Sequence, residues 1–319
     1  MQKFLLQHRT AKLLMLCTFA ASSWAAQGQG LVSRSGVVYV PSQEKNFALQ
    51  NIRTPELPAT LYFAGERVPL ENFDTRESLL RELMVNTYWH SQTMHIIKLA
   101  NRWLPVIEPI MKANNLPDDF KYLCAAESAF QQLISPANAV GFWQILAGTG
   151  RDLGLEITTE IDERYHVEKS TAAAARYLHR GYRAFGSWAM AAAAYNMGEQ
   201  GLRNQVVRQK TSSYYDLRLN DETSRYLFRI LALKIIMSDP EKYGFFPNPD
   251  DLYPPFRFRE VAVSTAVPSW VDFAAQHGTN YKILKTLNPW LRGASMENKA
   301  QKTYHIKIPE AGFRENAYK

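Results

Sequence analysis

The chain has very little cysteine and no strong excess of charge of one sign. Its 319 residues include two cysteines, Cys17 and Cys124. If an N-terminal leader is removed, only Cys124 remains, so the mature chain can form no internal disulfide and must rely on its core. Lysine and arginine number 37 and aspartate and glutamate 30, and removing the leader's three cations leaves 34 against 30. An excess this small excludes a dedicated nucleic-acid binder, whose affinity comes mainly from phosphate contacts.

Several signatures of common enzyme classes are also missing. The sequence has no Gly-x-Ser-x-Gly elbow, no phosphate-binding Gly-x-x-x-x-Gly-Lys-Ser/Thr loop and no His-Glu-x-x-His helix. His90 and His95 are five positions apart, which places them on different faces of a helix and argues against a metal pair. We therefore expect no metal and no cofactor.

Long hydrophobic runs are absent too. The apolar run Leu13–Ala21 is too short to span a bilayer as a permanent helix. Hydrophobic residues make up 46% of the chain and charged residues 21%, close to the average soluble globular domain. This composition excludes a mostly disordered, a collagen-like or a polytopic membrane protein.

Residues 1–25 have the three-part layout of a secretory signal peptide. The run Leu13–Ala21 follows three cations and precedes small residues, with Ser23 and Ala25 at the positions that a signal peptidase reads. Leu16 precedes Cys17, where a lipid anchor requires a small residue, so we expect no lipidation. The prediction is export to the periplasm or cell envelope; the alternative is an ordinary buried N-terminal helix.

The rest of the chain divides by composition. Residues 26–75 are proline-bearing and predict an extended segment, whereas residues 76–240 show helical periodicity and predict five to seven helices with short connections. Residues 241–257 form a proline-rich linker. Residues 258–310 predict a small β-α-α-β module. The expected fold class is mainly α, with a helical domain and a small α+β domain.

The strands and helices of this module can be placed closely. Two segments alternate like strands and two short segments between them are typical of helices. The strands are expected at Phe258–Val263 and Thr303–Ile308 and the helices at Trp270–His277 and Tyr281–Leu287.

One carboxylate stands out in an apolar helical stretch. Glu127 follows Leu123-Cys124-Ala125-Ala126, where desolvation would raise its pKa and make it a usable acid near neutral pH. The alternative is a glutamate at a helix edge that forms a salt bridge or a cap. Cys124 is a candidate nucleophile by type, but a single cysteine in such a stretch is more typical of a core residue.

Further polar residues follow at turns and helix ends. Gln144 comes after a turn that begins at Ser135, three positions beyond Gly141, and its amide could bond a ligand amide. An alanine-rich helix then ends in Tyr195 and Asn196. The alternatives are a surface glutamine, helix caps and a core tyrosine.

In this order, these segments resemble the motifs of the SLT-type lytic transglycosylases, glycoside hydrolases of family 23 that share a goose-type lysozyme fold. Within this family the chain resembles the membrane-bound lytic transglycosylase D group. The resemblance covers residues 76–240. The matching segments are Glu127-Ser128, Gly141-x-x-Gln144, Asp162-Glu163-Arg164, Ala194-Tyr195-Asn196-x-Gly198 and Glu222-Thr223-Ser224-Arg225-Tyr226.

The resemblance implies an enzyme with one catalytic carboxylate acting on peptidoglycan glycan strands. By motif position Glu127 would be the acid and base that cleaves the MurNAc-GlcNAc β-1,4 bond and forms 1,6-anhydroMurNAc. Ser135 and Gln144 would hold the N-acetyl or peptide-bearing groups of the sugar. Tyr195, Asn196 and Tyr226 would line the subsite and orient the carboxylate.

The C-terminal module resembles a LysM glycan-binding domain in its β-α-α-β order and in Leu287-Asn288-Pro289. Where LysM domains usually have Gly-Asp-Thr after the first strand, this chain has Ser264-Thr265-Ala266-Val267-Pro268. We therefore expect a degenerate LysM-like domain.

Two other functions stay open at this point. A hydrolytic goose-type lysozyme would need a second carboxylate near the cleaved bond, for which Glu199 and Asp162 are candidates. A catalytically inactive cell-wall-binding protein would not need Glu127. Nucleic-acid partners are not expected, and peripheral association with the cell envelope is compatible with either function.

Overall fold

The computed structural model describes residues 52–315. The predicted signal peptide and about half of the predicted extended segment, residues 26–51, lie outside these residues. The described part begins with a short antiparallel hairpin, β1 (Tyr62–Phe63) and β2 (Glu66–Arg67), in which Tyr62 pairs with Arg67.

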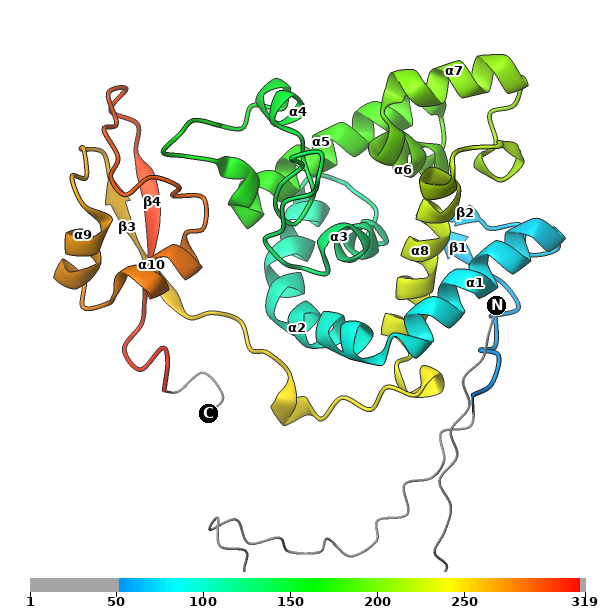
Figure 1. The fold of residues 1–319 in the computed structure, drawn as a ribbon, viewed down its shortest axis with the longest axis horizontal. Helices are drawn as coiled ribbons and strands as arrows, with labels where there is room; N and C mark the ends of the chain where they lie inside the picture. Colours follow the sequence, from blue (N-terminus) through cyan, green and yellow to red (C-terminus); the bar gives the residue numbers. More distant parts are fainter. Residues whose placement is uncertain (1–51, 316–319) are drawn as a thin grey trace, which may run out of the picture. The chain divides into compact units, whose positions relative to one another are not determined.

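The chain from there to residue 238 is mainly helical, and Figure 1 shows how its helices are arranged. In chain order the α-helices are α1 (Phe73–Tyr88), α2 (His90–Ala113), α3 (Phe120–Ser128), α4 (Ala147–Asp152), α5 (Val167–Phe185), α6 (Trp188–Met197), α7 (Glu199–Gln209) and α8 (Asp221–Ser238). The 3-10 turns η1 (Glu163–Tyr165) and η2 (Tyr214–Asp216) lie between them, and η3 (Glu241–Tyr243) and η4 (Pro249–Asp251) follow α8.

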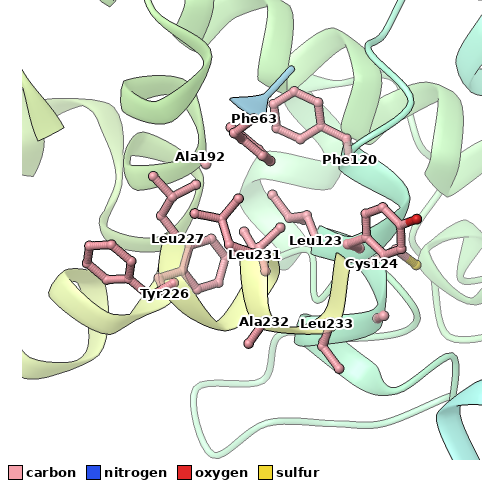
Figure 2. Close-up of a cluster of buried hydrophobic side chains, with 14 of the residues drawn as sticks. Phe63, Phe120, Leu123, Cys124, Ala192, Tyr226, Leu227, Leu231, Ala232 and Leu233 are labelled. Carbon is pink, nitrogen blue, oxygen red and sulfur yellow. The ribbon is translucent and has the colours of Figure 1, made fainter. Parts of the chain in front are cut away.

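Helix α3 lies at the centre of the helical domain, surrounded in Figure 1 by α2, α5, α6 and α8. Its residues Leu123 and Cys124 are fully buried. Figure 2 shows Leu123 facing Leu231 of α8. The hairpin joins the same core, because the ring of Phe63 lies 5.2 Å from that of Phe120. A buried helix is thus held on several sides, so a side chain at its end can be placed accurately.

Helices α5 and α6 pack closely because both present small residues. A Cβ atom added to Gly181 would lie 3.2 Å from the Cα of Ala191. The hairpin fixes the start of α6, where both carboxylate oxygens of Glu66 accept hydrogen bonds from the backbone N–H groups of Trp188 and Ala189. A carboxylate at a helix N-terminus stabilises it by satisfying free donors and by interacting with the helix dipole.

The C-terminal module has the predicted β-α-α-β order. It contains β3 (Phe258–Val263), α9 (Trp270–Gln276), α10 (Tyr281–Leu287) and β4 (Tyr304–Pro309). The two strands are antiparallel, with Val263 opposite Tyr304 and Phe258 opposite Pro309. Trp270, Ile306 and Ile308 are fully buried between the sheet and the helices.

The predicted fold class is confirmed: a mainly α, lysozyme-like domain is followed by a small α+β domain. The expected number of helices was wrong, since residues 73–238 contain eight α-helices. Two of the breaks are single residues, Trp89 between α1 and α2 and Gly198 between α6 and α7, and no proline marks them. None of the helices within residues 52–315 combines the length and the apolar character that crossing a bilayer requires.

Candidate active site

A cleft of about 590 Å³ opens at the end of α3. It collects five of the six residues predicted to form the site, from three separate parts of the chain. These are Glu127 from α3, Ser135 and Gln144 from the loop that follows it, and Tyr195 and Asn196 from the end of α6. The sixth, Tyr226, lies behind the cleft wall and contacts Glu127 directly.

Glu127 is the penultimate residue of α3. The helix stops because Ala129 and Phe130 both adopt left-handed backbone conformations, with φ of 52° and 57°. Such angles are costly for residues other than glycine and collect at functional sites. The abrupt end allows Glu127 to reach the cleft while the preceding turns stay in the core.

The environment of Glu127 makes its carboxyl a proton donor near neutral pH. Burial raises the pKa of Glu127 to about 7, because the protein around the carboxyl group disfavours the charged form. The Tyr226 hydroxyl donates a hydrogen bond to Oε1, which opposes that rise by stabilising the carboxylate. An acid with a pKa close to the working pH can both give and take a proton.

Two charges on α8 act on the same carboxyl with opposite sign. Arg229 lowers the pKa of Glu127 and Glu222 raises it. Glu222, Tyr226 and Arg229 are spaced at four and three residues, so they share one face of α8. Arg229 and Arg225 also pair with Glu82, a buried carboxylate of α1, which holds α8 against α1.

The loop of residues 133–146, named here the site loop, is held largely by its own hydrogen bonds. The Ser135 Oγ accepts a bond from the Ala139 N–H at 3.0 Å, and a hydroxyl that accepts can still donate to a ligand. The Gln144 side chain donates to the carbonyls of Leu133 and Gly141 at 3.1 and 2.8 Å. Its amide nitrogen is thus engaged within the loop, and its carbonyl oxygen is the group left to accept an N–H from a ligand.

Tyr195 and Asn196 join the other elements together at the cleft. The Tyr195 hydroxyl donates to the Trp143 carbonyl at 2.6 Å, which ties α6 to the site loop. The Oδ1 of Asn196 accepts from the Thr223 hydroxyl at 2.7 Å and ties α6 to α8. Both side chains therefore fix the cleft walls as well as lining them.

The cleft also contains residues that the sequence prediction missed. Glu222 and Tyr177 line it, and Arg229 acts on Glu127 electrostatically. The helical spacing of Glu222 and Arg229 from Tyr226 could have indicated these two residues of α8. Tyr177 lies on α5, and no sequence motif indicates it. Its ring packs 5.2 Å from that of Tyr195.

The other candidates from the sequence lie elsewhere. Asp162 is buried and paired with Arg164, and Glu199 is paired with Arg180; neither lines the cleft. Cys124 is fully buried with its thiol against the Phe142 carbonyl, and burial raises its pKa well above the usual value. Within residues 52–315 no cluster of three or more histidine, cysteine, aspartate or glutamate side chains has the arrangement of a metal site.

Taken together, the geometry places Glu127, whose pKa is about 7, in an open groove lined by hydroxyl, amide and aromatic groups. Leu133, Ile134 and Leu146 leave apolar surface exposed on the site loop. A groove of this kind suits a long polar chain with apolar faces, and Glu127 can perform acid and base catalysis on it.

Comparison with known families assigns the two domains. Residues 105–217 match the transglycosylase SLT domain, and residues 259–312 match the C-terminal LysM-like domain of soluble lytic transglycosylases. Glu222, Tyr226 and Arg229 lie beyond the first matched range, which ends at Leu217, directly after η2.

Two curated relatives are also similar to this chain. They are the membrane-bound lytic murein transglycosylases D of Escherichia coli K12 and of Escherichia coli O6:H1. Each is 32% identical over 258 residues, which is 78% of this chain and 55% of the relative. The chain thus spans about half the length of these relatives.

Proposed function

We propose that this chain, which carries a transglycosylase SLT domain and a LysM-like domain of the soluble lytic transglycosylases, is a peptidoglycan lytic transglycosylase. The observation that carries the proposal is the position of Glu127. It is the carboxyl with a pKa of about 7 in a cleft that also contains Ser135, Gln144, Tyr195 and Asn196.

In the proposed reaction Glu127 first acts as an acid. It donates its proton to the glycosidic oxygen between N-acetylmuramic acid and N-acetylglucosamine, and the C1–O4 bond breaks. The resulting carboxylate then takes the proton from the C6 hydroxyl of the muramoyl residue, whose oxygen bonds to C1. The products are a free 4-hydroxyl end and a 1,6-anhydromuramoyl end, and no water is consumed.

The surrounding residues have separate roles in this proposal. Tyr226 orients the Glu127 carboxyl through its hydrogen bond and stabilises the carboxylate between the two proton transfers. The Ser135 hydroxyl and the Gln144 carbonyl oxygen hold the N-acetyl or peptide-bearing groups of the sugar. Tyr195 and Asn196 line the subsite and keep the cleft walls together.

We further propose that the protein is exported, through the signal peptide of residues 1–25, to the periplasm or cell envelope. Residues 26–75 would be an N-terminal segment, residues 76–240 the catalytic domain, residues 241–257 a linker and residues 258–310 the LysM-like domain. Peptidoglycan glycan strands would be the partner of the cleft.

Hydrolysis is the second candidate reaction, because the cleft contains Glu222 as a further carboxylate. A lysozyme mechanism would use it to activate a water molecule or to stabilise the developing cation. The two reactions differ in their products, since hydrolysis leaves a reducing muramoyl end.

The test of the proposal is the isosteric variant Glu127→Gln, assayed for release of soluble fragments from purified sacculi. Removal of a general acid typically costs about 10²- to 10⁴-fold in rate, and we expect a loss in this range. The matched control is Glu199→Gln, which removes a carboxylate outside the cleft and should keep the parent rate. An unchanged rate in Glu127→Gln would rule out Glu127 as the acid. An inactive parent chain would favour a wall-binding protein.

A further inference from the structure

The C-terminal module contacts a segment of the helical domain that lies next to the cleft. This segment, residues 156–165, is named here the bridging segment. Its Glu160 carbonyl accepts the N–H groups of Arg292 and Gly293 at 2.7 and 3.1 Å. The Asp162 N–H donates to the Trp290 carbonyl at 2.9 Å, so the backbones are joined on both sides of Ile161.

Side chains add further contacts between the module and the bridging segment. The Tyr304 hydroxyl and the Lys302 ammonium group of the module both bond the carboxylate of Glu156. The guanidinium of Arg292 lies over the ring of Tyr165, 4.2 Å from its centroid. The module and the bridging segment are therefore held together by backbone hydrogen bonds, an ion pair and a cation–π contact.

The hydrophobic core of the module continues through the bridging segment into the site loop. Ile161 and Tyr165 are buried in one cluster with Trp290 and Leu291 of the module, and Val140 belongs to the same cluster. Val140 pairs in the site loop with Ile145, through backbone bonds of 3.1 Å in both directions. Part of the site loop is thus buried against the core of the module.

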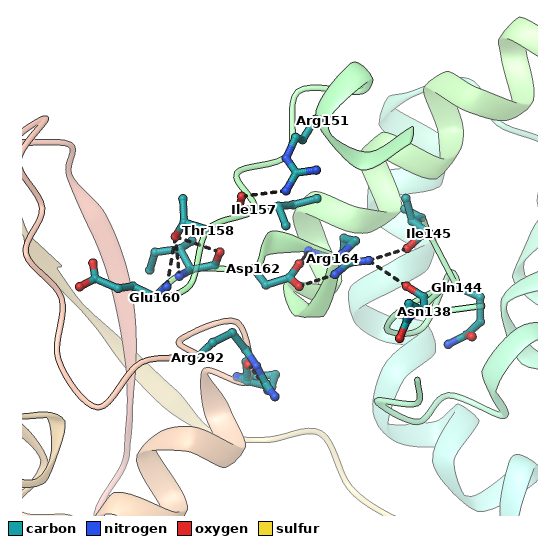
Figure 3. A network of polar contacts seen from close by, with 12 residues as sticks. Asn138, Gln144, Ile145, Arg151, Ile157, Thr158, Glu160, Asp162, Arg164 and Arg292 are labelled. Carbon is teal, nitrogen blue, oxygen red and sulfur yellow. Dashed lines mark hydrogen bonds and ion pairs between the residues drawn. The ribbon is translucent and has the colours of Figure 1, made fainter. Parts of the chain in front are cut away.

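Arg164 links the bridging segment to the site loop, as Figure 3 shows. Its Nε and Nη2 bond the two carboxylate oxygens of Asp162 at 3.0 and 2.7 Å. Its Nη1 donates to the carbonyls of Asn138 and Ile145 at 3.1 and 3.2 Å. Arg164 is 8% exposed and Asp162 7%, so these bonds are made away from water, where they are strong and costly to lose.

We propose that Arg164 is a positioning residue for substrate binding, and that the LysM-like module acts as a brace that holds the bridging segment and, through Arg164, the site loop. This inference rests on the proposed function, because it assigns a role to the wall of that same cleft. The loop carries Ser135 and Gln144, and neither Arg164 nor the module lines the cleft.

The guanidinium group is suited to this role by its shape. It is planar, and its fork binds the carboxylate with two parallel bonds while a third nitrogen reaches the two carbonyls. A lysine ammonium group keeps the charge but cannot match these acceptors together. The loop also contains Asn138 and Gln144 with φ of 61° and 46°, conformations that persist only when neighbouring groups fix them.

The first test is Arg164→Lys in the full chain, with Arg176→Lys as the matched control. Arg176 also donates to a backbone carbonyl, that of Leu153, but away from the site loop. On a soluble glycan tetramer we expect Arg164→Lys to raise KM roughly tenfold with a smaller change in kcat, because a displaced loop weakens binding. Its pH profile should stay that of the parent, since the neighbours of Glu127 are untouched.

A second readout separates positioning from a general loss of stability. In Arg164→Lys the amides of Val140 and Ile145 should exchange with solvent faster, while those of α3 and α8 keep the parent rates. Arg176→Lys should change neither set. An unchanged KM together with unchanged exchange in the site loop would overturn the role of Arg164.

The brace is tested from the module side with Leu291→Ala, which removes a buried contact to Ile161, and with the milder Arg292→Ala. If the module acts as a brace, each variant should raise KM by the same factor on the soluble glycan tetramer and on sacculi. A glycan-anchoring module predicts a loss on sacculi alone, which would overturn the proposal, as would no loss on either. If Leu291→Ala does not fold, Arg292→Ala decides. Failure of the proposed function is distinct, because the parent chain itself would then be inactive.

Discussion

At the scale of single residues, the proposed chemistry depends on how burial and three neighbours set the pKa of Glu127. Burial raises it, Tyr226 and Arg229 lower it, and Glu222 raises it. Together these effects give Glu127 a pKa of about 7, at which both the protonated acid and the carboxylate base are populated near neutral pH. Each neighbour can be removed without touching the glutamate, so the balance is open to experiment.

The first prediction concerns the alkaline limb of the pH profile of kcat/KM. The proposed reaction needs protonated Glu127, so the rate should fall as the pH rises through about 7. Tyr226→Phe removes a bond that stabilises the carboxylate, so the pKa should rise and the limb move to higher pH. Glu222→Gln removes a negative neighbour, so the limb should move to lower pH. Each shift should be roughly one pH unit.

A limb that moves to higher pH in Tyr226→Phe and to lower pH in Glu222→Gln would support these roles of the two neighbours of Glu127. Shifts of the same sign in both variants, or a limb unmoved by either, would contradict it. Glu199→Gln serves again as control, because its partner Arg180 lies outside the cleft.

Sequence reasoning placed Glu127 in the cleft with four of its neighbours, because each occurs in a recognisable local pattern. It did not reveal what their polar atoms do. The bond from Tyr195 to Trp143 and that from Asn196 to Thr223 join residues 52 and 27 positions apart. Contacts over such distances depend on how helices pack, and no periodicity encodes them.

At the scale of elements, the turn around Gly141 decides the shape of the site loop. Gly141 has φ of +80°, and a Cβ atom there would lie 2.3 Å from the carbonyl oxygen of Arg164. Both the conformation and the space require glycine. The bridging segment therefore approaches the loop as closely as the backbone allows.

The second prediction compares two glycines of this region by urea unfolding. Gly141→Ala should lower the free energy of unfolding by about 1–3 kcal/mol or more, because it combines left-handed strain with a steric clash. Gly148→Ala should raise it by about 0.5–1 kcal/mol, because Gly148 lies inside α4 with nothing within 4 Å of an added Cβ. Equal stability of the two variants would mean that the loop does not depend on this approach.

Elements were predicted well where the signal is local. The strand Phe258–Val263 and the helix Tyr281–Leu287 begin and end where the alternation and the periodicity placed them. The hairpin at residues 62–67 has strands of two residues each, too short to show alternation. It is held by packing of Phe63 on Phe120 and by the cap that Glu66 places on α6, and both are tertiary contacts.

At the scale of the whole molecule, the described residues join two domains that the sequence treats as separate. Composition and the proline-rich stretch predicted a linker followed by a small module, and they did not indicate how the two domains pack. In the structure Val140, Ile161 and Tyr165 of the helical domain are buried in one cluster with Trp290 and Leu291 of the module. The sequence could not reveal this because buried residues of an interface look like core residues of either domain.

The proposed brace would give the LysM-like domain a use that does not require sugar binding. Its first loop lacks the usual Gly-Asp-Thr, and the loop after α10 makes the backbone bonds to Glu160 and Asp162. Mutation of the module should therefore change substrate binding in the cleft. The comparison of KM on a soluble glycan with KM on sacculi tests this.

The most direct test of the central claim is the mass of the muramoyl products released from sacculi in water labelled with heavy oxygen. A lytic transglycosylase that uses Glu127 as acid and base should give 1,6-anhydromuramoyl ends that are one water lighter than reducing ends and carry no label. Glu127→Gln should release neither. Labelled reducing ends from the parent chain would contradict the account and identify a hydrolase.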